Sequence, residues 1–207
     1  MTTQATSIPR ARQPEREVRT AVVRFAGDSG DGMQLAGLQF TQTTALAGND
    51  LSTLPDFPAE IRAPVGTLAG VSAYQIQFGD QSVHTPGDSP DVLVAMNPAA
   101  LKVNVKDLVE GGIIITDSSQ FGENNLKKAG YKTNPVEDGS LAAYRVIPIP
   151  LSELTVNALA GLSMKKADAE MSRNMFALGI SYWLFDRSID PTVEFFRKKF
   201  AKNETVV

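Results

Sequence analysis

Hydrophobic residues along the chain fall into two patterns that alternate from about residue 19 onward. Short runs rich in branched aliphatic residues predict β-strands at 20–25, 71–78, 91–97, 112–117 and 144–149. Apolar residues near the helical spacing predict helices at 33–46, 98–108, 121–128, 151–162, 172–185 and 191–200. Strands and helices that alternate across short connections predict an α/β fold, an open doubly wound, mostly parallel sheet with flanking helices in a single domain.

Three segments lie outside this alternation. Residues 1–18 are polar, carry prolines and show no apolar period, so we predict a disordered leader before a domain at 19–202. Residues 203–207 are predicted to be a tail or the start of a linker. The interior segment 51–70 is too interrupted for a long helix, with breaks at Pro55, Pro58, Pro64, Gly66 and Gly70. Its part from 55 to 70 predicts an ordered loop.

Charge and hydropathy exclude several kinds of partner. The formal net charge of -3 over 207 residues is spread without long runs of one sign, unlike the basic footprint of nucleic-acid binding. No stretch reaches the roughly 18 to 20 apolar residues that cross a bilayer, and the N-terminus lacks the apolar segment of a secretory signal. We therefore expect a cytoplasmic protein that binds neither nucleic acid nor a membrane.

The chemical inventory of the side chains is small. The chain has no cysteine, which excludes disulfides, thiolate-held zinc and cysteine-ligated iron–sulfur clusters within it. Its only histidine is His84, in a predicted turn or strand end, where a solvated or backbone-bonded imidazole is the simpler reading. We expect no metal ligands and no complete catalytic set in this chain, so any redox centre must lie on another chain.

A glycine-rich loop, Gly27-Asp28-Ser29-Gly30-Asp31-Gly32, joins the first predicted strand to the first helix. Glycines allow close backbone approach, and the following helix N-terminus offers free N–H groups to an anion, which favours a phosphate-bearing ligand. The two aspartates would repel a pyrophosphate, however, and the spacing is neither G-x-G-x-x-G nor the P-loop. The alternative is a tight structural turn in which Asp31 or a neighbour caps the helix.

The proline-framed segment around residue 60 is the second candidate for an interaction. Glu60 and Arg62 lie near its centre, followed by Pro64. A rigid, charged loop loses less conformational entropy on binding, which suits contact with a partner or substrate. An internal salt bridge on the surface explains the same two charges equally well.

Four segments, taken together and in order, resemble one known family. They are 25–35 (FAGDSGDGMQL), 49–64 (NDLSTLPDFPAEIRAP), 91–101 (DVLVAMNPAAL) and 173–179 (RNMFALG). They closely resemble the N-terminal gamma domain of the alpha subunit of 2-oxoacid:ferredoxin oxidoreductases, especially the 2-oxoglutarate branch. The resemblance extends from about residue 19 to about residue 202.

The resemblance implies a part in the oxidative decarboxylation of a 2-oxoacid to acyl-coenzyme A, with ferredoxin as electron acceptor. Thiamine diphosphate and iron–sulfur clusters would lie on partner domains, namely the thiamine-binding alpha and beta domains or subunits, and coenzyme A would be the cosubstrate. The family's gamma-type domain covers the active site and is associated with coenzyme A. That assigns the loop from Gly27 to Gly32 to coenzyme A or the active site, and Glu60, Arg62 and Pro64 to an interface.

The sequence departs from the family pattern in two ways. Fused alpha subunits continue into a thiamine-pyrimidine domain, whereas this chain stops at residue 207, as expected of a split subunit or a truncated fused one. The acidic glycine loop also differs from the G-x-G-G-x-G form common in the family. We expect the isolated chain to be inactive, and the alternative function is a free-standing nucleotide-binding or regulatory α/β module.

Overall fold

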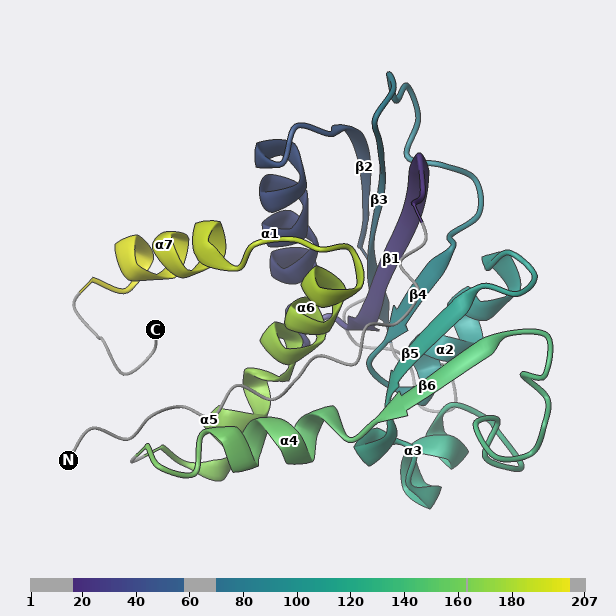
Figure 1. Ribbon diagram of the computed structural model, residues 1–207. Helices are drawn as coiled ribbons and strands as arrows, with labels where there is room; N and C mark the ends of the chain where they lie inside the picture. The colour runs from purple at the N-terminus through teal and green to yellow at the C-terminus, as the bar shows by residue number, and fades with distance from the viewer. Residues whose placement is uncertain (1–16, 58–69, 163, 202–207) are drawn as a thin grey trace.

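The computed structural model describes residues 17–57, 70–162 and 164–201. One six-stranded sheet in the order β2-β3-β1-β4-β5-β6 forms its centre (Figure 1). β1 pairs in parallel with β4, β4 with β5 and β5 with β6, whereas β3 runs antiparallel to both β1 and β2. The strands are β1 (Thr20–Asp28), β2 (Asp50–Asp56), β3 (Val71–Gly79), β4 (Val92–Ala95), β5 (Ile113–Asp117) and β6 (Arg145–Ile149).

Helices cover both faces of the sheet and make a three-layer domain (Figure 1). α1 and α6 pack on one face and α2 and α3 on the other, while α7 lies beside α1 and extends away from the sheet. The helices are α1 (Met33–Leu46), α2 (Pro98–Asn104), α3 (Glu123–Lys128), α4 (Leu151–Ala158), α5 (Lys166–Met171), α6 (Arg173–Leu184) and α7 (Asp190–Lys199), with 3-10 turns η1 (Val105–Asp107) and η2 (Ser118–Gln120).

The core on the α1 side is organised around Phe40. Its side chain is fully buried, and its ring lies 5.6 Å from the ring centroids of both Phe25 and Phe78. From the C-terminal part of the chain, Tyr182 stacks on it at 6.0 Å and Phe185 meets it edge-on at 5.8 Å. Aromatic pairs in these geometries add to the hydrophobic gain of burial, so this cluster fastens α1 and α6 to the sheet.

The core on the α2 side uses the alternate residues of the same strands, including Leu93, Ala95 and Ile114. The start of α2 follows the sequence pattern: Pro98 is the first helical residue, and the Asn97 side chain accepts a hydrogen bond from the Ala100 amide at 2.8 Å. Such a cap satisfies an otherwise unpaired amide and fixes where the helix begins.

The connections diverge between β1 and β4. The chain leaves β1 into α1 on one face of the sheet and leaves the adjacent, parallel β4 into α2 on the opposite face. In open α/β sheets this divergence creates a crevice beyond the carboxyl ends of the two strands, and ligands bind there. The glycine loop and Asn97 lie at this position.

The five predicted strands and the predicted α/β class are confirmed, with several differences in detail. β2 was not predicted, because Pro55 suggested a loop from residue 55 onward; an edge strand tolerates a proline that a central strand does not. The short α5 was not predicted either. The predicted helices 98–108 and 151–162 are too long, since α2 passes into η1 after Asn104 and α4 ends at Ala158.

The leader and the tail of the predicted domain organisation lie largely or wholly outside the described residues. The domain limits therefore remain predictions. Across residues 17–57, 70–162 and 164–201, no helix has the length and hydropathy needed to cross a membrane.

Candidate functional site

The glycine loop lies at the carboxyl end of β1, as the sequence predicted. Gly27 and Asp28 are the last residues of the strand, and α1 begins directly after Gly32. Ser29 and Gly30 are exposed at the tip, and no heavy atom of the described chain lies within 4 Å of the position a Gly30 Cβ would take. The loop therefore presents an open tip to the crevice.

Asp31 is the buried centre of the loop. Its carboxylate receives the Arg173 guanidinium, from the first turn of α6, with Nη2 to Oδ1 at 2.5 Å. The other oxygen accepts hydrogen bonds from the Asp28 amide at 3.0 Å and from Asn97 Nδ2 at 3.4 Å. The side chains of Arg173 and Asp31 are only 20% and 7% exposed, so solvent screens this pair little.

Asn97 ties the glycine loop to the next strand. Its amide nitrogen donates to Asp28 Oδ1 at 2.9 Å, while its oxygen caps α2. Partial burial, followed in size by repulsion from the Asp31 carboxylate, raises the pKa of Asp28 above its ordinary value, although part of the residue faces solvent. One neutral side chain thus holds both loops that border the crevice.

Gly32 is the N-cap of α1, with φ 70° in the left-handed region. The predicted side-chain cap from Asp31 or a neighbour is wrong, because no side chain of the described residues caps α1. The tight turn of that alternative is present, with the Asp31 amide donating to the Asp28 carbonyl at 2.9 Å. The Asp31 carboxylate closes the loop on itself instead. The first turn of α1 contains no acidic residue, so its partly positive N-terminus faces the crevice without a carboxylate in that turn.

At two of the three loop glycines, the surrounding atoms leave no room for a larger side chain. A Cβ on Gly27 would come within 2.7 Å of Asp31 Oδ2, and a Cβ on Gly32 would collide with the Asn174 amide. Asn174 also donates a hydrogen bond to the Gly32 carbonyl at 3.3 Å. Gly30 has no close neighbour among the described residues and no positive φ, so that part of the chain does not require glycine at the tip.

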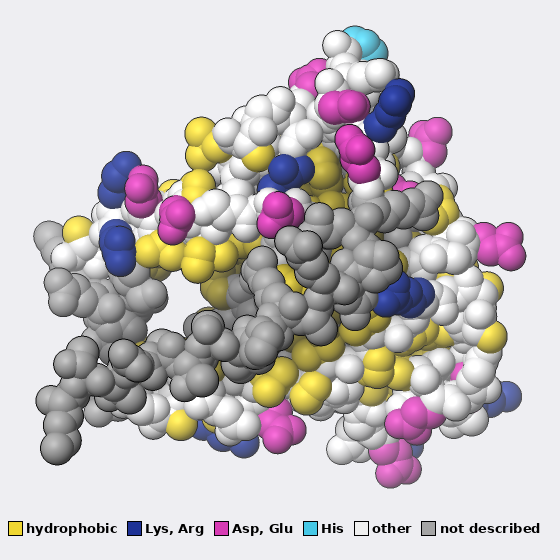
Figure 2. All heavy atoms as spheres, viewed as in Figure 1, with side chains coloured by type: hydrophobic (Ala, Val, Ile, Leu, Met, Phe, Trp, Pro, Cys, Tyr) yellow, Lys and Arg dark blue, Asp and Glu magenta, His cyan; other side chains and the backbone are white. Residues whose placement is uncertain are grey.

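The remaining sequence candidates lie elsewhere. Glu60, Arg62 and Pro64 are outside the described residues, so their role at an interface remains a prediction. His84 is exposed in the loop after β3, at the edge of the molecule in Figure 2. In the part of the chain that the structure describes, no group of three or more histidine, cysteine or acidic side chains could hold a metal.

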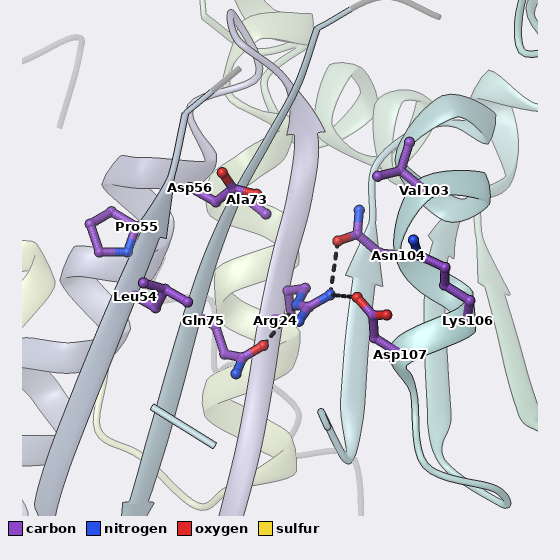
Figure 3. A pocket seen from close by; sticks show the side chains of 10 residues that line it. All are labelled: Arg24, Leu54, Pro55, Asp56, Ala73, Gln75, Val103, Asn104, Lys106 and Asp107. Carbon is purple, nitrogen blue, oxygen red and sulfur yellow. Dashed lines mark hydrogen bonds and ion pairs between the residues drawn. The ribbon is translucent and has the colours of Figure 1, made fainter. Parts of the chain in front are cut away.

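Sequence reasoning missed a second polar cluster, centred on Arg24. The guanidinium donates to Gln75 Oε1 at 2.8 Å, to Asn104 Oδ1 at 3.1 Å and to Asp107 Oδ2 at 2.7 Å (Figure 3). It borders a cleft of about 240 Å³ between β2 and the α2–η1 turn. These bonds join β1 to β3, α2 and η1, so Arg24 helps to hold the α2 layer on the sheet. The signal in the sequence was a cation between the apolar residues Val23 and Phe25 of a strand.

Comparison with known proteins identifies the family. The family model described as pyruvate ferredoxin/flavodoxin oxidoreductase matches residues 22–207. The chain belongs to this family. It is 50% identical over 194 residues to the 2-oxoglutarate oxidoreductase subunit KorA of Mycobacterium tuberculosis. The aligned region covers 93% of this chain and 30% of KorA.

Solved structures agree with this membership. A 2-oxoglutarate:ferredoxin oxidoreductase from Magnetococcus marinus, with 2-oxoglutarate, coenzyme A and succinyl-CoA bound, matches with TM-score 0.67 and 27% identity, over 90% of this chain and 28% of that one. The gamma subunit of a keto/oxoacid ferredoxin oxidoreductase from Geobacter sulfurreducens matches in fold alone, with TM-score 0.54 and 20% identity over 78% of this chain and 75% of its own. The chain thus spans under a third of KorA and under a third of the Magnetococcus marinus enzyme chain.

Within this oxidoreductase family fold, three of the four family-like segments meet in space. The glycine loop (25–35), the segment with Asn97 (91–101) and the start of α6 (173–179) converge on the Asp31 carboxylate. Arg173 and Asn174 begin the fourth family-like segment, but the sequence did not predict them as site residues. Their sequence separation of 142 residues from the loop hides the contact.

Proposed function

We propose that this chain is the gamma-type part of a 2-oxoacid:ferredoxin oxidoreductase, with 2-oxoglutarate as the substrate of the complex. In that role it helps to cover the active site and to place coenzyme A, while partner domains carry thiamine diphosphate and the iron–sulfur clusters. The observation that carries the proposal is the convergence of three family-like segments at the topological switch point. The KorA relative and the solved enzyme with bound coenzyme A support the choice of substrate class.

The chemistry of the loop suits a polyanion held weakly by this chain. Coenzyme A carries phosphates, and the N-terminus of α1 supplies partial positive charge and amides near the tip. The charge of Asp31 is balanced by Arg173, but Asp28 places a second carboxyl group beside the crevice. The loop therefore shapes the site more than it supplies affinity, and the cations that bind the phosphates firmly come from a partner.

The cysteine-free sequence fits a supporting role of this kind. An iron–sulfur cluster requires thiolate ligands, which this chain lacks, so electron transfer takes place on partner chains. The isolated chain is accordingly inactive. The interface includes Glu60, Arg62 and Pro64, as the family resemblance implies.

Replacing Gly30 by valine tests the function of the loop. The added side chain enters space that no other described residue occupies, so the free energy of unfolding should change by less than about 0.5 kcal/mol. In the assembled enzyme, the same branched side chain stands where coenzyme A must approach, and we expect its KM to rise about tenfold or more. Steady-state kinetics with the partner chains present provide the measurement.

An unchanged KM and turnover in the Gly30→Val enzyme would reduce the loop to a structural turn. Titration of coenzyme A into the isolated chain is the companion measurement, with weak or undetectable binding expected. Tight binding of coenzyme A or another nucleotide by the isolated chain would favour a free-standing nucleotide-binding module instead.

The surface of α6 supports an assembly with other chains. Trp183 is 62% exposed on it, and Met171 just before it is 72% exposed, although this helix also supplies the buried residues Ala177 and Leu178. A helix that is apolar on more than its core-facing side is characteristic of one covered by further protein. Hydrophobic side chains also lie along the neighbouring α7 in Figure 2.

We therefore expect Trp183→Glu to weaken association with the partner chains by about a hundredfold or more, because buried tryptophans dominate many interfaces. The free energy of unfolding of the variant chain should fall by less than about 1 kcal/mol, since Trp183 is exposed in the lone chain. Sedimentation of the mixed subunits measures the first effect and thermal unfolding the second. Assembly of the variant at wild-type affinity would exclude this face from the interface.

A further inference from the structure

We propose that Arg173 and Asn174 are positioning residues that hold the glycine loop in place. Arg173 also balances the charge of Asp31, so that the tip of the loop accepts an anionic ligand. The inference deepens the proposed function and rests on it. It assigns a role in coenzyme A binding to two side chains of α6 that bind Asp31 and Gly32 and not the exposed tip residues Ser29 and Gly30.

Arg173 and Asn174 both hold the glycine loop in place. Arg173 contacts Asp31, and the next residue, Asn174, donates to the carbonyl of Gly32 and fills the space beside its Cα. Two consecutive residues of α6 therefore fix two consecutive residues of the loop. Asn97 binds Asp28, so the loop is held near both of its ends, while Ser29 and Gly30 at its tip are exposed.

Arg173 also determines the charge of the loop. Without Arg173, Asp31 and Asp28 would present two carboxylates within one turn, beside the N-terminus that should attract an anion. Arg173 Nη2 lies 2.5 Å from Asp31 Oδ1, close enough to balance one of them. The electrostatic potential at the tip is then set mainly by the amides of α1 and by Asp28, whose charge Lys128 also offsets in part.

The Arg173–Asp31 ion pair is a costly way to join α6 to the loop. Burying a charged pair costs desolvation, and apolar residues would join α6 to the loop as strongly. The Arg173 Nε is itself buried with no hydrogen-bond partner among the described residues, which adds to this cost. α6 is already fastened to α1 through Ala177, Leu178 and Tyr182. A costly pair in a helix that apolar packing already holds points to control of loop geometry and charge.

The test compares three variants in the enzyme assembled with its thiamine-binding partners. Arg173→Gln leaves Asp31 unbalanced, and we expect the KM for coenzyme A to rise about tenfold or more, with kcat reduced much less. Adding Asp31→Asn to it removes the stranded charge and should restore most of the lost affinity. The control is Arg187→Gln, which removes another partly buried arginine, bonded to Asn49 at 2.6 Å near the opposite end of α6. It should lower stability but leave this KM unchanged.

Hydrogen exchange of the amides at 28–34, measured on the purified chain, provides a readout independent of activity. If Arg173→Gln fails to fold, Arg173→Lys is the substitute variant, because it keeps the positive charge. In either variant we expect the amides at 28–34 to exchange faster than in the parent chain. If Arg173→Gln leaves the KM unchanged while Gly30→Val raises it, the positioning role is wrong and the proposed function stands. If neither changes the KM, the loop has no part in coenzyme A binding and both fail. A double variant no better than Arg173→Gln would refute charge balance.

Discussion

Phe40→Ala is expected to lower the free energy of unfolding by about 3 to 5 kcal/mol, because the ring is fully buried and its removal leaves a cavity. The ring contacts Phe25 and Phe78 of the sheet and Tyr182 and Phe185 of the C-terminal part, so their mutual packing is lost together. For a domain of this size the melting temperature should fall by roughly 6 to 20 °C. Thermal and denaturant unfolding of the purified chain give both values.

The matched control is Leu38→Ala, on the same helix but 42% exposed. It should cost less than about 1 kcal/mol, since little apolar surface leaves contact with the protein. Equal losses in the two variants would mean that α1 is not fastened through Phe40, in conflict with the aromatic cluster of the fold.

Gly32→Ala is expected to cost about 2 to 4 kcal/mol, from two sources. A left-handed φ of 70° is unfavourable for any residue with a Cβ, by roughly 1 to 2 kcal/mol. The new methyl group also meets the Asn174 amide, which must move and give up its bond to the Gly32 carbonyl. Unfolding curves measure the loss, and the KM for coenzyme A should rise with it in the assembled enzyme.

Gly30→Ala separates this steric effect from a general intolerance of the loop. Position 30 has no close neighbour among the described residues and no positive φ, so the free energy of unfolding of this variant should stay within about 0.5 kcal/mol of the parent. Removing the obstructing side chain with Asn174→Gly should recover part of the loss in Gly32→Ala. Failure of that double variant to recover anything would place the whole penalty in the backbone.

Local rules predicted the elements whose causes are local. The start of α2 could be read from Asn97-Pro98, because a cap and a first-turn proline act within four residues. Buried strands such as β4 could be read from their continuous aliphatic runs. β2 was missed because a proline has opposite meanings in central and edge strands, and only the assembled sheet decides which strand is the edge.

The site was predicted only in part for a related reason. The loop could be placed at the end of β1 from its glycines, but its two aspartates look alike in the sequence. In the fold one is buried against Arg173 and the other remains at the crevice with a raised pKa. The difference depends on a residue 142 positions away, and no spacing rule reaches that far.

The core around Phe40 also has a consequence for biosynthesis. α1 leaves the ribosome long before Tyr182, whose hydroxyl meets Thr43 across 139 residues of sequence. At ordinary translation speeds the apolar face of α1 waits roughly 7 to 28 seconds for the helix that covers it. During that interval the nascent chain is open to chaperones or to aggregation. The yield of a core variant in cells will therefore depend on protection of this early intermediate as well as on the stability of the finished domain.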